Sequence, residues 1–334
     1  MTFLTRIQDD PAWIPHGIDA QAKVVEFIRV PDSALKKAGF LFEFEAHSAS
    51  DRHSLTFEQV LQIRAQHVPL HFIFHSAFCR STLLARALNV PGKSTGLSEP
   101  GIFAAIANAG DAVKPLVPAL LSLLAKPRGT EQVVFAKPTN HANRLIPLLL
   151  SASPSSKAIL MSNDLPVFLK SVRRRGLLGR RWGRELFLEM QSYAGMDFQM
   201  SPRESFAMTD MQAAGLAWFL NQNYFHSLSN SAFADRLRIL NGDRFNDERA
   251  ETLQAALSFT GVELSDGEAK QAASSAIFDT HAKLGGQFSD TVPPVAASLT
   301  SDAINDEEAA QVGEWLSHYS RQIGLELPLA QNLT

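Results

Sequence analysis

This chain of 334 residues has only one cysteine, and it has neither long apolar runs nor a strong excess of charge of one sign. Its single cysteine, Cys79, excludes an internal disulfide framework and is typical of a reducing compartment. The net charge of −3 gives no global field for nucleic acid or an anionic membrane, so any polyanion must be bound locally. The one local basic cluster runs from Arg173 to Arg184.

Signals for secretion and for membrane insertion are missing as well. The N-terminal stretch MTFLTRIQDDPAW has no basic region followed by an apolar core, which argues against a secretory signal. The apolar run from Leu116 to Ala125 falls short of the roughly 18 residues that a membrane span needs. We therefore expect a cytoplasmic protein without a membrane span and without a nucleic-acid partner. The sequence carries no signal of oligomeric state.

Short apolar runs do occur, and they alternate with helical patterns through the middle of the chain. Four of them are predicted as strands, at residues 71–75, 132–136, 157–161 and 236–240. Helices are predicted at residues 102–109, 116–125, 140–150, 165–176, 179–193, 209–228, 247–260 and 305–324. Alternation at this spacing implies right-handed parallel crossovers. We therefore predict an α/β fold, a parallel β-sheet flanked by helices in a three-layer sandwich with a helical elaboration.

The remaining segments are predicted as follows. Residues 22–30 and 39–47 alternate enough to be strands, and residues 54–66 read as a helix with Ser54 and Glu58 near a capping arrangement. Residues 92–103, GKSTGLSEPGIF, are rich in Gly, Ser and Pro and are predicted as a loop. We expect three parts, which are N-terminal strands and a helix (1–66), a main domain (67–300), and a C-terminal helix and tail (301–334).

The stretch from His71 to Phe103 has the order strand, loop, helix, which creates a site for an anion. The loop ends in Arg80, Ser81 and Thr82, just before the helical pattern STLLARAL. The first N–H groups of a helix have no internal partner and carry the positive end of its dipole, so they favour a phosphate or sulfate there. The alternative is an ordinary turn from strand to helix with Ser81 as the N-cap.

This loop fits the spacing of the phosphate-loop pattern G-x-x-x-x-G-K-[ST] but lacks both glycines and the lysine. It resembles more closely the 5′-phosphosulfate loop of sulfotransferases, F-P-R-S-G-T-T-L-L. The shared residues are Phe78, Arg80, Ser81, Thr82, Leu83 and Leu84. An alignment of Phe78, Arg80 and Ser81 with the family's loop leaves two residues missing before Thr82. An alignment of residues 81–84 without a gap puts Arg80 where the family has glycine. The resemblance implies a P-loop-like fold and a donor, 3′-phosphoadenosine 5′-phosphosulfate (PAPS), held by Ser76, Phe78, Cys79, Arg80, Ser81 and Thr82.

Two further segments resemble sulfotransferases in the same order along the chain. The segment LSEPGIF places Glu99 before Pro100, where glycan-modifying sulfotransferases carry a Glu-Pro pair that supplies the base. The segment VVFAKPTNH puts Lys137 at the end of a strand, where those enzymes have a Lys-Thr-Pro-like element near the sulfate. The alternative without a catalytic role is that Glu99 is a solvated loop residue and that Lys137 reaches solvent beyond the end of its strand.

A third segment, KAILMSNDLPVFLKSVRRRG, resembles the family's site for the 3′-phosphate. Ser171 stands at the family's position, but Asn163 replaces the family's arginine, which removes a bidentate fork for phosphate. Arg173 or Arg174 is then expected to substitute, unless the 3′-phosphate is bound elsewhere. A later stretch with Lys283 resembles the basic loop that closes over the nucleotide.

The resemblance implies that sulfuryl transfer relies on positioning and charge stabilisation. Glu99 would take the proton of the acceptor, while Arg80 or Lys137 counters charge on the bridging oxygen. His75 is an alternative base, although such a histidine is more often a hydrogen-bonded core residue. The acceptor is a hydroxyl or amine of a small molecule, a glycan or a peptide, in a pocket expected between helices at residues 101–126 and 179–230.

Other interpretations remain open at this point. A phosphate-loop kinase of a small molecule would need magnesium and a loop lysine, and that lysine is absent. The ten histidines are scattered and no residues have metal-ligand spacing, so we expect no metal. A nucleotide-binding protein that has lost catalysis is the third interpretation. Trp182 and Trp218 would stack on adenine or belong to the core, and Arg180, Arg181 and Arg184 form a solvated face or a patch for an acidic acceptor.

Overall fold

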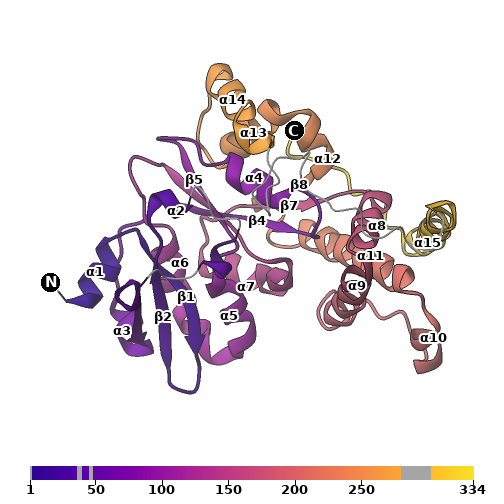
Figure 1. Cartoon of the computed structure of the whole chain (residues 1–334), viewed down its shortest axis with the longest axis horizontal. Coiled ribbons are helices and arrows are strands. Elements are labelled where there is room, and N and C mark those ends of the chain that lie inside the picture. Colours follow the sequence, from indigo (N-terminus) through magenta and orange to yellow (C-terminus); the bar gives the residue numbers. More distant parts are fainter. Residues whose placement is uncertain (1, 36–39, 45–47, 280–301) are drawn as a thin grey trace.

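The computed structural model describes residues 2–35, 40–44, 48–279 and 302–334. Its centre is a parallel sheet of five strands in the order β5-β6-β4-β7-β8 (Figure 1). These strands are β4 (Leu70–His75), β5 (Ser94–Ser98), β6 (Val133–Lys137), β7 (Ala158–Ser162) and β8 (Leu237–Asn241). Strand β4 pairs in parallel with β6 on one side and with β7 on the other. Four of the five strands confirm the apolar runs that were predicted as strands.

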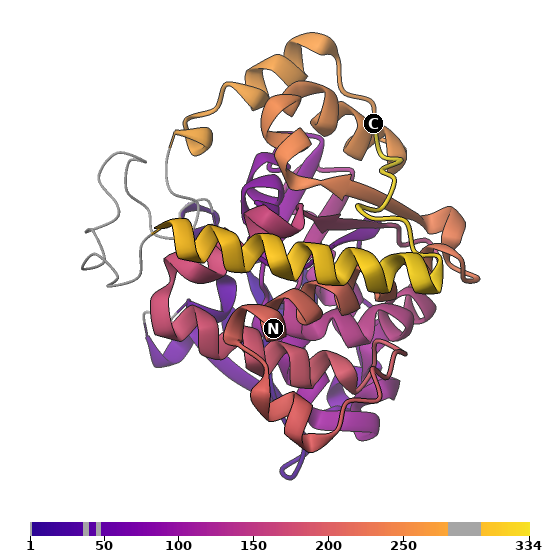
Figure 2. The same ribbon diagram turned by 90° about the vertical axis from the view of Figure 1, so that its right-hand side faces the viewer.

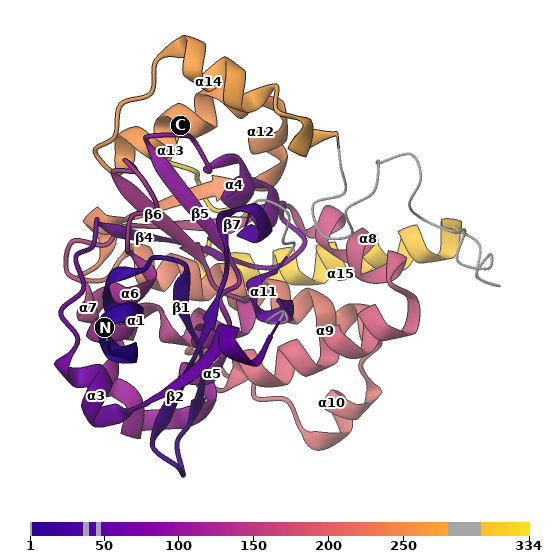
Figure 3. The same cartoon turned by 60° about the vertical axis from the view of Figure 1, so that its left-hand side comes forward.

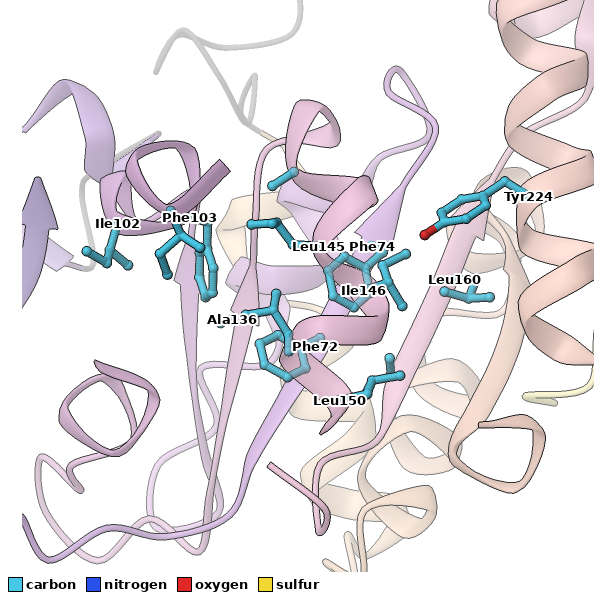
Figure 4. Packing of buried hydrophobic residues seen from close by; sticks show 14 of the residues in the cluster. Phe72, Phe74, Ile102, Phe103, Ala136, Leu145, Ile146, Leu150, Leu160 and Tyr224 are labelled. Carbon is cyan, nitrogen blue, oxygen red and sulfur yellow. The ribbon is translucent and has the colours of Figure 1, made fainter. Parts of the chain in front are cut away.

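Side chains of this sheet point alternately into two helical layers. On β4, Phe72 and Phe74 face one layer (Figure 4), and Ile73 faces the other. The first layer contains α5 (Gly101–Ala109), α6 (Val117–Leu124) and α7 (Ile146–Ala152), the last preceded by a 3-10 helix at Asn140–Leu145. The second contains α4 (Ser81–Ala87), α12 (Gly242–Asp247), α13 (Arg249–Phe259) and α14 (Asp266–Ala273). The predicted α/β fold with three layers is confirmed.

A helical elaboration extends the first layer. It consists of α8 (Leu165–Arg174), α9 (Gly176–Gln191), α10 (Pro202–Ala207), α11 (Asp210–Ser229) and α15 (Asp302–Ile323). Helix α15 runs across α8 and α11 in Figure 2, and its Val312 and Leu316 are buried. Among the described residues, none of the helices combines the length and the apolar character that crossing a membrane requires.

The N-terminal part forms a second, antiparallel sheet in the order β1-β2-β3. Its elements are α1 (Phe3–Asp9), β1 (Trp13–Asp19), β2 (Val24–Arg29), α2 (Asp32–Leu35), β3 (Arg52–Thr56) and α3 (Phe57–Gln62). Strand β1 packs against α5 (Figure 3). This contact brings the N-terminal hairpin beside the carboxyl edge of the parallel sheet.

Two predictions for this N-terminal part are wrong. The described portion of residues 39–47 contains a 3-10 helix at Leu41–Glu43 in place of a strand. Ser54 lies in β3 and caps nothing, because the helix begins only at Phe57. Thr56 and Gln59 form the capping box, in which the hydroxyl of Thr56 accepts the N–H of Gln59 and the amide oxygen of Gln59 accepts the N–H of Thr56.

The loop predicted at residues 92–103 is also wrong, because this segment contains β5 and the start of α5. Gly96 contributes to the loop prediction, but it lies inside β5 where α4 packs against the strand. A Cβ atom at this position would lie 1.7 Å from the carbonyl oxygen of Ala85. Glycine is therefore required here for close packing of helix against strand, which sequence composition alone does not distinguish from a turn.

Candidate active site

The candidate site lies at the carboxyl end of β4, the central strand of the parallel sheet. From β4 the chain crosses through α4 on one face to β5, and from β6 it crosses through α7 on the other face to β7. The carboxyl end of β4 is therefore the point at which the direction of the crossovers reverses. Ligands of open α/β sheets bind in the crevice at such a point.

Residues 76–80 connect β4 to α4 with a strained backbone. Ala77, Phe78 and Arg80 have φ values of 72°, 55° and 64°, the left-handed region that residues other than glycine rarely adopt. Each such residue costs on the order of 1–3 kcal/mol and persists only where the surroundings hold it. Non-glycine residues in this conformation cluster at ligand clamps and active sites, which makes the loop a candidate binding element.

Several contacts hold this loop in place. The amide of Asn163, just after β7, donates to the carbonyl of Phe78 at 3.2 Å, and the thiol of Cys79 donates to the carbonyl of Met161 at 3.4 Å. Gly242 packs against the loop, and a Cβ atom there would lie 2.2 Å from the carbonyl oxygen of Cys79. The ends of β7 and β8 thus fix the loop that follows β4.

The first residues of α4 leave two hydroxyl groups at the loop. Ser81 and Thr82 are the first two helical residues and are buried, and neither hydroxyl has a hydrogen-bond partner among the described residues. The N-cap is Arg80, so Ser81 does not occupy the N-cap position of the simple-turn interpretation. The guanidinium of Arg80 forms an ion pair with Asp243 of α12.

Three side chains that the sequence singled out separately meet beside this loop. Lys137 ends β6, Glu99 follows β5 and His75 ends β4, and these three strands are neighbours in the sheet. The Nζ atom of Lys137 lies 2.5 Å from Oε1 of Glu99 and 3.0 Å from Nε2 of His75. Glu99 itself has a φ of 50°, so a fourth strained residue lies at this edge of the sheet.

The electrostatics of this triad follow from its burial. Lys137 is completely buried, which lowers the pKa of its ammonium, while the nearby Glu99 carboxylate opposes the shift. The backbone N–H of Ala77 donates to Nδ1 of His75, so the proton of a neutral imidazole is assigned to Nε2. Nε2 lies 3.1 Å from the carbonyl of Pro138 and can donate to it. His75 is thus held by the protein on both ring nitrogens.

A cavity of about 780 Å³ opens next to the triad, and Glu99 is the member of the triad that lines it. The described residues around it come from the N-terminal hairpin, the 3-10 helix at Leu41–Glu43, the segment from the end of β5 into α5, the 3-10 helix before α7 with the residue that precedes it, and α9. They are His16, Gly17, Glu26, Phe42, Glu99, Pro100, Gly101, Ala104, Ala107, Asn108, Thr139, His141, Arg144 and Glu189. Helices α5 and α9 belong to the two ranges expected to form an acceptor pocket. The contribution of the N-terminal hairpin was not foreseen.

The cavity also contains a histidine and glutamate pair that the sequence interpretation missed. Nδ1 of His141 lies 2.5 Å from a carboxylate oxygen of Glu189, and this hydrogen bond raises the pKa of the imidazole. Nε2 of His141 has no hydrogen-bond partner among the described residues. The carboxylate thus orients the ring, as in catalytic triads. Nothing in the sequence links the two residues, because 48 positions separate them.

Three of the residues considered for the 3′-phosphate site, Asn163, Ser171 and Arg173, contact other protein groups in this structure. The Asn163 amide holds the loop, and its Oδ1 atom is buried without a partner. The hydroxyl of Ser171 donates to the carbonyl of Val167 within α8, and Arg173 pairs with Asp306 at 2.8 Å. Lys283 lies outside the described residues. Arg174 is exposed and has no ion pair with a described residue.

Both tryptophans considered for adenine stacking pack against protein groups. Trp182 of α9 contacts the rings of Phe78 and Phe168, with centroids 5.1 and 6.2 Å away. Trp218 of α11 is buried, and its indole N–H donates to the carbonyl of Asn163 at 2.8 Å. These packing contacts support the alternative in which the tryptophans belong to the core. Trp182 nevertheless touches the loop through Phe78.

Comparisons with known proteins do not place this chain in a family. No family model and no curated protein matches the chain. One of the solved structures that match is a sulfotransferase domain from the curacin biosynthetic pathway, with 12% identity and a TM-score of 0.41. The match covers 80% of this chain and 95% of that chain. At this TM-score we base no argument on the likeness.

Proposed function

We propose that the protein is a sulfotransferase that moves a sulfuryl group from PAPS to a hydroxyl or amine of an acceptor. One observation supports this proposal above the others. Glu99, Lys137 and the strained loop 76–80 lie together at the carboxyl end of β4, with a cavity beside Glu99. The donor would bind at the loop and the acceptor in the cavity, so that the two reacting groups meet at Glu99.

The loop offers suitable groups for the 5′-phosphate of the donor. Backbone N–H groups in a left-handed loop form a concave cradle for anions, and the hydroxyls of Ser81 and Thr82 lack partners among the described residues. Arg80 would exchange its partner Asp243 for the phosphate. The 3′-phosphate would be bound by a basic residue at the end of α8, where Arg174 is exposed.

The reaction balances with these groups. The acceptor oxygen or nitrogen forms a bond to sulfur while the bond between sulfur and the bridging phosphate oxygen breaks. The acceptor proton passes to Glu99, and the negative charge of the leaving nucleotide is countered by Arg80 or Lys137. Because Lys137 is buried in a region of low dielectric, its charge acts over a longer range than it would in water.

His141 is a second candidate for the base, because it lines the same cavity with Glu189 at Nδ1. The two candidates differ in the pH dependence of turnover. If Glu99 is the base, turnover does not follow the protonation of His141 and is abolished in Glu99→Gln at every pH. If His141 is the base, turnover is lost as the pH falls through the pKa of its imidazole, which the hydrogen bond to Glu189 raises. A pH profile of the parent and of Glu99→Gln and His141→Asn variants distinguishes them.

Thermal-shift titration tests the donor. The nucleotide product, 3′-phosphoadenosine 5′-phosphate, should stabilise the protein without magnesium, by an amount that mass action sets. Stabilisation by ATP with magnesium alone would instead favour a kinase, and stabilisation by neither would favour a protein without a nucleotide site.

Substitutions then test the assigned residues. Glu99→Gln should abolish sulfuryl transfer from labelled PAPS while the thermal shift with the product nucleotide is kept, and unchanged transfer would remove Glu99 from its role. Arg80→Ala should weaken nucleotide binding. Equal binding by that variant would favour the ungapped alignment of the loop, in which Lys137 alone counters the charge.

A further inference from the structure

The junction between α8 and α9 exposes two apolar side chains. Leu177 and Leu178, in the first turn of α9, are 79% and 78% exposed. Gly176 begins this helix with a φ of 60° and allows the sharp turn between the two helices. The end of α8 lies near the beginning of α15, since Arg173 pairs with Asp306 at 2.8 Å. Leaving two adjacent leucine side chains in water is unfavourable, and the described residues do not cover them.

Basic residues flank the two leucines in the sequence. Residues 170–184 contain no aspartate or glutamate. Three arginines of this segment pair with acidic residues elsewhere: Arg173 with Asp306, Arg181 with Glu185, and Arg184 with Asp210. Four other cations have no ion pair with a described residue, and they are Lys170, Arg174, Arg175 and Arg180. The basic cluster noted in the sequence is therefore only partly neutralised.

We propose that the α8–α9 junction docks the protein on an anionic phospholipid surface. Leucines at a helix end can enter the boundary between headgroups and acyl chains, while flanking arginines stay at the level of the headgroups. Each basic residue near an anionic leaflet adds attraction that falls off within a Debye length. Because the whole protein carries a net charge of −3, this attraction is confined to the junction and would orient the molecule.

A lipid surface fits this patch better than a protein partner does. A stable protein interface buries at least about 1,000 Å² between complementary surfaces, far more than two neighbouring leucine side chains provide. A bilayer needs no complementary shape, and it satisfies apolar and cationic groups at adjacent depths. The guanidinium of Arg175 also lies 5.1 Å from the ring of Phe78 in the loop after β4. Docking would therefore place the candidate site near the lipid surface.

Sedimentation with lipid vesicles tests the proposal and does not depend on the proposed catalytic function. The parent protein should sediment with vesicles that contain phosphatidylglycerol and not with phosphatidylcholine alone, and salt should weaken the binding. Leu177→Asp/Leu178→Asp should lower the affinity about a hundredfold, because two side chains leave the apolar phase. Arg174→Glu/Arg180→Glu should lower it about thirtyfold. Phe206→Asp on α10, where Phe206 is 90% exposed, is the matched control and should bind as the parent does.

Three results would overturn the proposal. The first is a parent that sediments with neither kind of vesicle. The second is equal binding by the parent and both double variants. The third is a parent that self-associates through the junction, seen as a change of sedimentation coefficient in Leu177→Asp/Leu178→Asp without any vesicle binding. Circular dichroism and thermal unfolding of each variant confirm that it is folded, which is expected because the substituted side chains are exposed.

Discussion

Removing the Glu99 carboxylate should destabilise the fold through Lys137. The ammonium of Lys137 is completely buried, and the carboxylate at 2.5 Å is its charged partner. Glu99→Gln keeps the shape of that side chain but leaves a buried positive charge without compensation. Breaking a buried ion pair from one side costs about 3–5 kcal/mol. We expect the variant to lose about 3 kcal/mol of unfolding free energy, near the lower end of this range. The reason is that the Glu99 side chain is 12% exposed and the pair is therefore not fully shielded from water.

The loss also has a ceiling, because Lys137 can give up its proton. At about pH 7 a lysine of ordinary pKa loses its proton at a cost of about 4.6 kcal/mol, roughly 3.4 pKa units at about 1.36 kcal/mol each. A lysine that is neutral when folded and charged when unfolded binds fewer protons in the folded state. The stability of Glu99→Gln should therefore rise as the pH increases from about 7 toward about 10, while that of the parent changes less.

Urea unfolding of four proteins measures this coupling. The parent, Glu99→Gln, Lys137→Met and the double variant form a double-mutant cycle. Lys137→Met should cost less than Glu99→Gln, because the Glu99 carboxylate that remains lines a cavity and can be solvated. The double variant should be more stable than Glu99→Gln, because it contains no buried charge. A double variant less stable than Glu99→Gln, or a loss below about 1 kcal/mol in Glu99→Gln, would refute the reasoning.

Three more predictions concern other parts of the molecule. Gly96→Ala should cost several kcal/mol in urea unfolding, because its Cβ would lie 1.7 Å from the Ala85 carbonyl oxygen, whereas an unchanged midpoint would show that α4 can move away. Lys126→Met should cost about 3 kcal/mol, because the buried ammonium donates to three backbone carbonyls, and full stability in a thermal melt would contradict this. Glu189→Gln should destabilise the protein more at about pH 6 than at about pH 9. The hydrogen bond to Glu189 raises the pKa of His141 in the folded protein. This interaction therefore stabilises the fold fully below the unfolded pKa of about 6.5, and the stabilisation is lost as the pH rises through the folded pKa. An equal loss at both pH values would argue that the His141 pair is not charged.

The order of strands and helices in the main domain was largely predictable because it depends on local patterns. Short apolar runs are typical of strands that a parallel sheet buries on both faces, and four such runs form β4, β6, β7 and β8. The fifth strand escaped prediction because Gly96 signals a turn in the sequence, whereas in the fold it permits contact with α4. The opposite error occurs at Leu41–Glu43. The alternation of apolar residues there predicted a strand, but the segment forms a 3-10 helix. The division of the chain near residues 66 and 300 stays a prediction.

For the candidate site, the sequence indicated residues but not their partners. It singled out Lys137 and His75 at strand ends and Glu99 in a predicted loop, and the catalytic roles that the resemblance implies for them stay predictions. It could not indicate that Lys137 would be completely buried against Glu99, nor that His141 would meet Glu189 in the same cavity. Such contacts join residues dozens of positions apart. They depend on which strands become neighbours.

The sequence by itself determined the alternation of strand and helix, the absence of a disulfide framework, and the local basic cluster around residues 173–184. These properties follow from composition and from periodicities of two and 3.6 residues, which act over a few neighbours. Only the tertiary structure decided that β5, β6 and β4 lie side by side, and so brought one carboxylate, one ammonium and one imidazole together. The physical reason is that strand order depends on how helices pack across the whole sheet, and no local pattern contains that information.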